Sequence, residues 1–222
     1  ASEIDIQRTK DGHYVVHHDD SLERLCGIKE SVSNLTLAEC KNLEVMDVLY
    51  GNGKKSELAT LDEMLELAKG KIYLYIELKG ESADERMADD LYRILLNRDM
   101  LDQVTVISLK YSLIEYLELT HPDVNTGFLC FVSLGDISTL QCDELLLEDE
   151  MATPEVIDRA HLANKKVYIW TINTNETLKK RMLDTSDGII TDEVVLAEKM
   201  YAQLVKRDDF TRIVDTIIFG FR

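Results

Sequence analysis

The sequence predicts an α/β fold in which a mostly parallel sheet is covered by helices and closes as a (β/α)8 barrel. Strand-like and helix-like segments alternate along most of the chain, a rhythm typical of parallel sheets. The length of 222 residues suits a single barrel domain. Polar side chains also stand at the carboxyl end of a strand-like segment, which is where barrels carry their functional residues.

The first quarter of the chain contains two strand signals and little regular structure after them. Glu3–Ile6 is strand-like, and a turn at 10–12 leads into a second short strand at 13–17. Residues 20–57 are polar and irregular, apart from one helix start at Thr36-Leu37-Ala38-Glu39, which has the pattern of a capping box.

From residue 60 the alternation becomes regular. A second capping box, Thr60-Leu61-Asp62-Glu63, opens a helix that ends before Gly70. The later segments alternate in type. Strands are expected at 72–79, 104–108, 126–131, 144–147, 166–171 and 188–191, and helices at 84–97, 112–119, from Pro154, from Asn175 as a cap, and at 194–205.

These segments amount to seven parallel strands, one fewer than a closed barrel needs. An open doubly wound sheet is the alternative, but no glycine-rich phosphate loop follows any strand. No linker interrupts the pattern, so we expect one barrel domain at 1–200 and an amphipathic tail at 201–222. The tail either packs on the core or contacts a membrane or a partner.

Composition restricts the partners. The formal net charge of −17 argues against nucleic acid, which requires a basic surface, and it repels a phosphate-bearing ligand unless a divalent cation reverses the local sign. The chain has no apolar run long enough to cross a membrane. The four cysteines form no metal or redox motif and are expected to be buried thiols.

Two pairs of charged residues stand two positions apart in strand-like segments: Glu3 with Asp5, and Glu77 with Lys79. Residues so spaced share one face of a strand, and a charge on a buried strand is costly unless it is paired or binds a metal. With His18 nearby in sequence, they predict a metal site for an anionic substrate. The plainer reading is solvent-facing charges, a Glu77–Lys79 ion pair and a loop histidine.

Parity places this polar pair on the inside of the barrel. In the segment 72–79, the even-numbered apolar residues share the face suited to packing under helices, so Glu77 and Lys79 lie on the opposite, interior face. Trp170 ends its strand on the face opposite Val167 and Ile169.

Several motifs together resemble those of the glycerophosphodiester phosphodiesterase family. The family pattern E-x-D-V-x-x-T-K-D-G, then V-V-x-H-D-x-x-L-x-R, is similar to residues 3–12 and 15–24. The resemblance covers about residues 1–200. It continues through Leu35-Thr36, Thr60-Leu61-Asp62-Glu63, Tyr75-Ile76-Glu77-Leu78-Lys79, Trp170-Thr171-Ile172-Asn173 and Asp187-Gly188-Ile189-Ile190-Thr191-Asp192.

The resemblance implies a TIM-type barrel that uses Mg²⁺ or Ca²⁺ to hydrolyse small-molecule glycerophosphodiesters to sn-glycerol 3-phosphate and an alcohol, in lipid and glycerol metabolism. It further implies roles for individual residues. Glu3, Asp5 and Glu77 would hold the metal, His18 would be the general acid or base, Lys79 would steady the phosphate and Trp170 would wall the substrate pocket.

The chain departs from the family pattern at its start. The family carries a second histidine in a His-Arg-Gly strand that is followed by Pro-Glu-Asn, and this sequence contains neither run. We therefore expect a first βα unit to be missing from this chain, and the isolated fragment to be impaired in catalysis. The motifs around Glu77 and Trp170 resemble bacterial members whose catalytic domain follows a membrane region, so an upstream membrane region is compatible with the sequence. A cytoplasmic or extracellular location is equally open.

Two other functions stay open. A catalytically impaired barrel could act as a binding or regulatory module, which the missing histidine favours. Another lipid phosphodiesterase, similar to phospholipases C or D, would share the same motifs. The sequence contains no headgroup determinant that separates these substrates.

Overall fold

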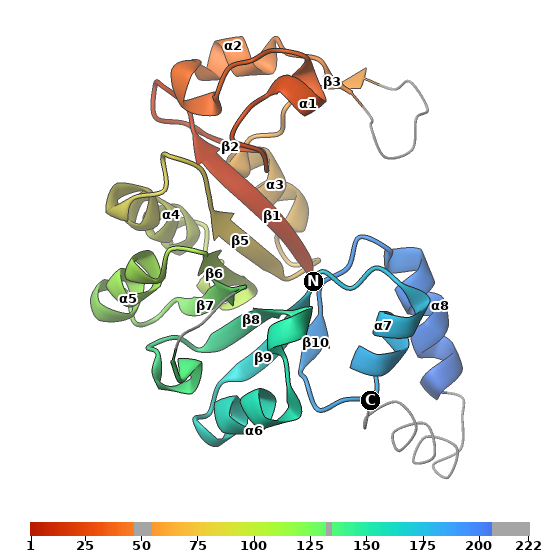
Figure 1. Ribbon diagram of the computed structural model, residues 1–222. Coiled ribbons are helices and arrows are strands. Elements are labelled where there is room, and N and C mark those ends of the chain that lie inside the picture. The colour runs from red at the N-terminus through yellow and green to blue at the C-terminus, as the bar shows by residue number, and fades with distance from the viewer. Residues whose placement is uncertain (47–54, 132–134, 206–222) are drawn as a thin grey trace. The chain divides into compact units, whose positions relative to one another are not determined.

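The computed structural model describes residues 1–46, 55–131 and 135–205, in two compact units (Figure 1). The first unit is Ala1–Thr126 and the second is Gly127–Arg222. Of the amphipathic tail expected at 201–222, only residues 201–205 are among the described residues, so the prediction for the rest lies outside them. The one-domain prediction for 1–200 stays a prediction.

The first unit is built on a sheet with the strand order β6-β5-β1-β2. β1 (Ser2–Arg8) runs parallel to β5 (Leu74–Leu78), β5 runs parallel to β6 (Val104–Ser108), and β2 (Tyr14–Val16) is antiparallel to β1. These four strands were predicted from the sequence. β1 and β5 lie side by side in register, which brings their carboxyl ends to the same edge of the sheet (Figure 1).

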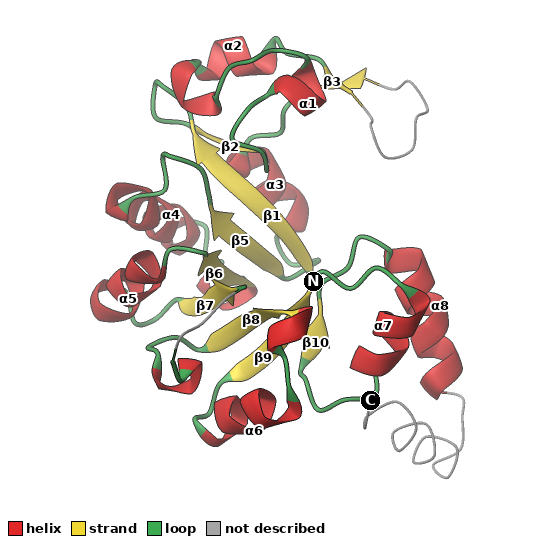
Figure 2. Ribbon diagram, viewed as in Figure 1, coloured by secondary structure: helices red, strands yellow, loops and turns green. Residues whose placement is uncertain are grey.

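Three helices belong to this sheet: α3 (Leu61–Ala68), α4 (Glu85–Asn97) and α5 (Tyr111–Thr120). Figure 2 shows α4 and α5 beside β5 and β6. The expected parity is confirmed for Leu74, Ile76 and Leu78, which are fully buried in one apolar core with side chains from α3 and α4. This core includes Leu65, Leu74, Ile76, Leu78, Met87 and Leu91. Each such side chain stabilises the fold by about 1.5–3 kcal/mol. The expected parity was wrong for Ile72, which precedes β5 and is 40% exposed.

The segment between β2 and α3 is more regular than the sequence indicated. It contains α1 (Glu23–Cys26), α2 (Leu37–Lys41), β3 (Val45–Met46) and β4 (Lys55–Ser56). The capping box that opens α2 at Thr36 is present as predicted. The segment has a small core of its own, formed by Val15, Leu22, Val32, Cys40 and Leu58. Apolar residues so widely spaced give no periodic signal, but they anchor the loop that follows β2.

The second unit contains four parallel strands in the order β7-β8-β9-β10. Its strands are β7 (Asn125–Cys130, beginning at the end of the first unit), β8 (Glu144–Glu148), β9 (Lys166–Trp170) and β10 (Gly188–Ile189), and its helices are α6 (Pro154–Leu162), α7 (Asn175–Arg181) and α8 (Val194–Val205). One boundary was wrong: Thr174, not Asn175, caps α7, because its hydroxyl accepts the N–H of Thr177.

The described strands agree with the strand count that the sequence predicted. Three parallel strands in the first unit and four in the second make up the expected seven. Single 3-10 turns complete the described structure: η1 (Val32–Asn34), η2 (Leu101–Gln103), η3 (Ile137–Thr139) and η4 (Asp149–Met151). Within the described residues, every helix is too short or too polar to cross a membrane.

Candidate active site

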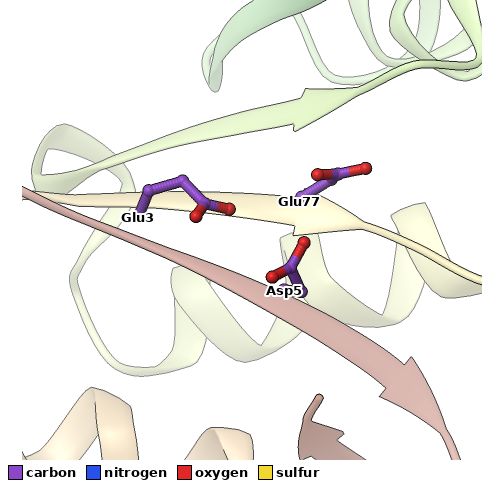
Figure 3. Close-up of side chains that lie close together, drawn as sticks. All are labelled: Glu3, Asp5 and Glu77. Carbon is purple, nitrogen blue, oxygen red and sulfur yellow. The ribbon is translucent and has the colours of Figure 1, made fainter. Parts of the chain in front are cut away.

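Three carboxylates from β1 and β5 converge at one point in the first unit (Figure 3). Asp5 lies opposite Glu77 in the parallel ladder, and Glu3 lies two residues before Asp5 on the same face. One oxygen from each of the three side chains lies within 4.8 Å of the other two. The same-face pairing predicted from the sequence is therefore confirmed for Glu3, Asp5 and Glu77.

Lys79 is part of this cluster. Its ammonium donates to Oδ1 of Asp5 at 3.0 Å and to Oε2 of Glu77 at 3.4 Å. Asp5 and Glu77 are only 8% and 7% exposed, so the lysine is their charge partner in a setting with little water. An ion pair so deeply placed is costly to form and costlier to break, because either partner alone would be an uncompensated buried charge.

Burial decides the protonation of this cluster. It raises the pKa of Glu77 to about 7, while Lys79 lowers it and Asp5 raises it by smaller amounts. Burial alone would lower the pKa of the Lys79 ammonium, but Glu77 and Asp5 outweigh it, so this pKa lies above its ordinary value. When both carboxylates are ionised, Asp5 and Glu77 together carry one more negative charge than Lys79 neutralises.

His18 lies on the loop that follows β2, and its side chain is 62% exposed. Its Nδ1 lies 2.9 Å from Oδ1 of Asp19, and Arg24 donates to both oxygens of that carboxylate at 2.6 and 2.9 Å. The hydrogen bonds from Arg24 hold the pKa of Asp19 well below its usual range. An ionised carboxylate only accepts, so the His18 proton sits on Nδ1 and Nε2 is left unprotonated in the neutral ring.

Gln7 fixes this loop against the end of β1, and the sequence analysis missed it. Its amide nitrogen donates to the carbonyl of His17 at 3.0 Å and to that of Asp19 at 2.8 Å. The signal was available, because Gln7 stands two residues after Asp5 and so continues the same face of the strand. His17 itself is buried, and burial lowers the pKa of its ring.

Trp170 belongs to the second unit, where it ends β9 as predicted. It is half-buried on the face opposite the buried Val167 and Ile169, and its indole Nε1 donates to the carbonyl of Leu146 at 2.8 Å. The four residues that the structure joins in one cluster are Glu3, Asp5, Glu77 and Lys79. His18 is linked to them through β2 and the Gln7 hydrogen bonds.

In an α/β barrel, acidic residues gathered on neighbouring parallel strands form a site of the hydrolase type. Such a site is able to hold a hard cation. The comparisons with known proteins specify the class. The profile of the glycerophosphoryl diester phosphodiesterase family matches residues 2–196. The chain belongs to this family, whose members are phosphoric diester hydrolases with the TIM-type (β/α)8 fold.

Individual relatives agree with this membership. A glycerophosphodiester phosphodiesterase of Caldanaerobacter subterraneus is 27% identical over 198 residues, which cover 86% of this chain and 81% of that protein. A structure from Silicibacter pomeroyi assigned to the same enzyme class has a TM-score of 0.82 at 22% identity, over 91% of this chain and 83% of that one. A phosphodiesterase of Oleispira antarctica was solved with the product sn-glycerol-3-phosphate. It has a TM-score of 0.70 at 21% identity, over 86% of this chain and 80% of that one.

Proposed function

We propose that this chain hydrolyses glycerophosphodiesters to sn-glycerol 3-phosphate and an alcohol, with a divalent cation held by Glu3, Asp5 and Glu77. The observation that carries the proposal is the convergence of these three carboxylates within 4.8 Å beside a lysine. The membership of the chain in the phosphodiesterase family supports the same reaction.

The donor set fits a hard divalent ion. Three carboxylates and one ammonium leave two negative charges in excess when all are ionised, and oxygen ligands of this kind suit Mg²⁺ or Ca²⁺. The raised pKa of Glu77 fits as well, because a bound cation would offset the burial that disfavours its charge. When bound, the ion would polarise the phosphoryl oxygens and neutralise developing negative charge.

His18 supplies the proton transfer in this proposal. Asp19 and Arg24 hold Nδ1 as the protonated nitrogen, so Nε2 is the nitrogen that would accept a proton from the attacking nucleophile or, once protonated, deliver one to the departing alcohol oxygen. A positioned general acid or base contributes roughly 10²- to 10⁴-fold to a rate. A histidine with unrestrained tautomers would spend part of its time with the wrong nitrogen protonated.

Two further residues are assigned to the substrate. Lys79 would steady a phosphate oxygen, since its ammonium already lies between Asp5 and Glu77 and keeps its third N–H donor spare. Trp170 would wall the substrate pocket, with its indole held by the Leu146 carbonyl.

Turnover of a glycerophosphodiester, followed through release of sn-glycerol 3-phosphate, tests the proposal. We expect slow hydrolysis, because the sequence lacks the family's second histidine, and we expect a chelator to abolish it and Mg²⁺ or Ca²⁺ to restore it. Glu77→Gln should lower kcat a further 10²-fold, roughly, or more. The matched control is Glu115→Gln, which removes an exposed carboxylate from the outside of α5.

Metal binding measured by calorimetry separates the proposal from its competitor. Wild-type protein should bind one divalent ion, and Glu77→Gln should not. Binding of metal and substrate with no product would favour a binding or regulatory module. Unchanged turnover in Glu77→Gln would overturn the assignment of the site.

A further inference from the structure

A polar cavity of about 340 Å³ lies beyond the carboxyl ends of β1 and β5. Its wall includes Gln7, which follows Asp5 by two residues on the same face of β1, and Glu81 and Ser82, which follow Lys79 by two and three residues. The opposite wall comes from the loop after β2 and the segment around η1, with Asp20, Glu30 and Ser31. The cavity therefore begins about 7 Å along β1 from the carboxylate cluster, given the rise of a strand.

The most buried of the described residues that line the cavity is Gln7, whose amide oxygen accepts no hydrogen bond from them. Gln7 is 4% exposed, and its Nε2 donates to the carbonyls of His17, His18 and Asp19 at 3.0, 3.5 and 2.8 Å, which identifies the nitrogen side of the amide. Its Oε1 is therefore on the other side, where it has no hydrogen-bond partner among the described residues. This oxygen packs against Gly80, where a Cβ would lie only 3.0 Å from it. Gly80 thereby leaves room for the amide in this position.

The rest of the wall adds negative charge. Asp20 and Glu81 form no ion pair or hydrogen bond within the part of the chain that the structure describes, in contrast to nearby Asp19, which Arg24 neutralises. Lys29 also lines the cavity, but its ammonium pairs with Glu23 at 3.4 Å. The hydroxyl of Ser82 accepts the backbone N–H of Arg8 at 3.0 Å. The cavity is therefore rich in acceptors and bears an excess of negative charge.

We propose that this cavity receives the alcohol part of the substrate and selects a primary ammonium group, as in glycerophosphoethanolamine. A primary ammonium brings one positive charge and three N–H donors, which match the amide oxygen of Gln7 and the two carboxylates. A quaternary trimethylammonium has no donor and is bound best by aromatic faces, and none of the described lining residues is aromatic. A neutral polyol gains nothing from the charge. The inference rests on the proposed phosphodiesterase function.

Competition between three substrates tests the inference. Glycerophosphoethanolamine should be hydrolysed with a kcat/KM about ten-fold above those of glycerophosphocholine and glycerophosphoglycerol, and this preference should shrink as salt is raised. Asp20→Asn and Glu81→Gln should each raise the KM for the ethanolamine substrate about three- to ten-fold with little change in kcat, and should leave the glycerol substrate unaffected.

Matched controls are Asp102→Asn and Glu115→Gln, which remove exposed carboxylates elsewhere in the first unit. They should leave all three substrates unchanged. Equal kcat/KM values for the three substrates, or equal losses for all of them in the cavity variants, would overturn the inference while leaving the proposed function standing. Absence of any turnover would count against the proposed function instead.

A binding measurement tests the preference of the cavity for a primary ammonium independently of catalysis. Titration of the protein with ethanolamine hydrochloride, followed by NMR, should shift the side-chain amide of Gln7 and the backbone amides of Ser31 and Ser82. Choline and glycerol at the same concentrations should shift them several-fold less. Equal shifts with choline, or shifts confined to residues outside the cavity, would contradict the selection of a primary ammonium.

Discussion

The Asp19 carboxylate accepts the Nδ1 proton of His18 at 2.9 Å while Arg24 holds its other side. His18 and Asp19 belong to the loop that follows β2, whose backbone is in turn held by Gln7, and Arg24 belongs to α1. Asp19 is therefore a positioning residue. It determines which imidazole nitrogen is protonated in the neutral ring, and the proposed function uses the other nitrogen for proton transfer.

Replacing Asp19 by asparagine should lower kcat about ten- to a hundred-fold with little change in KM, because the amide cannot satisfy all its neighbours. Oδ1 of Asp19 accepts from both His18 and Arg24, and Oδ2 accepts from Arg24 as well. An amide NH₂ at the Oδ1 position faces donors from His18 and Arg24 and favours the other tautomer of His18, whereas an NH₂ at the Oδ2 position faces the donor of Arg24 alone. Steady-state kinetics and the ¹⁵N shifts of the His18 ring measure both effects.

The control for this prediction is Asp102→Asn, which should leave the His18 tautomer and kcat unchanged. Asp19→Glu should recover part of the activity, since it restores a carboxylate. Wild-type kcat together with a wild-type tautomer in Asp19→Asn would show that the loop orients His18 without this contact.

Replacing Lys79 by methionine should strengthen divalent-ion binding and weaken catalysis. The ammonium lies 3.0 Å from Asp5 and 3.4 Å from Glu77, so it competes with a metal ion for the same carboxylates. Loss of this competing charge should raise the affinity for Mg²⁺ or Ca²⁺ several-fold, which corresponds to about 1 kcal/mol. Turnover should fall, because the variant lacks the ammonium that is proposed to steady a phosphate oxygen of the substrate.

Calorimetric titration with each metal and kinetics on the same samples check the Lys79 prediction. Lys71→Met is the matched control, since Lys71 is an exposed lysine before the start of β5. Weaker metal binding in Lys79→Met would mean that the ammonium organises the carboxylates rather than competing for them.

Replacing Asp84 by asparagine should reduce stability at neutral pH but not in acid. Asp84 joins β1 to α4: Arg8 donates to its two oxygens at 2.8 and 2.6 Å, and the N–H of Met87 donates at 2.9 Å. The hydrogen bond from Arg8 lowers the pKa of this carboxyl. The stabilisation that the ionised carboxylate provides is therefore complete at pH values above its pKa in the unfolded state, near 4. It is lost as the pH falls through the lower pKa of the folded state.

The expected loss in Asp84→Asn is about 1 kcal/mol at pH 7, a modest figure because the carboxylate is 48% exposed and screened by solvent. Asparagine still caps the helix, so the substitution isolates the charge. Denaturant unfolding at pH 7 and below pH 4 measures the difference, which should shrink in acid. A difference independent of pH would assign the effect to packing.

Much of the fold could be read from local sequence patterns. Capping boxes at Thr36 and Thr60 begin α2 and α3 as expected, because such caps depend on residues three positions apart. The parity of β5 also held, with Leu74, Ile76 and Leu78 in the core. Apart from α2, the elements between 20 and 57 were missed, since their small core joins side chains that are distant in sequence.

The sequence by itself determined which residues could form the site: the i, i+2 pairs Glu3–Asp5 and Glu77–Lys79 share strand faces whatever surrounds them. Only the tertiary structure decided that Asp5 lies opposite Glu77, because strand register depends on pairing between segments more than 70 residues apart. It alone joined His18 to Asp19 and Arg24, and it alone buried Gln7 at the edge of a cavity. Local pattern specifies the direction of a side chain, whereas its neighbours, burial and charge state follow from packing between distant parts of the chain.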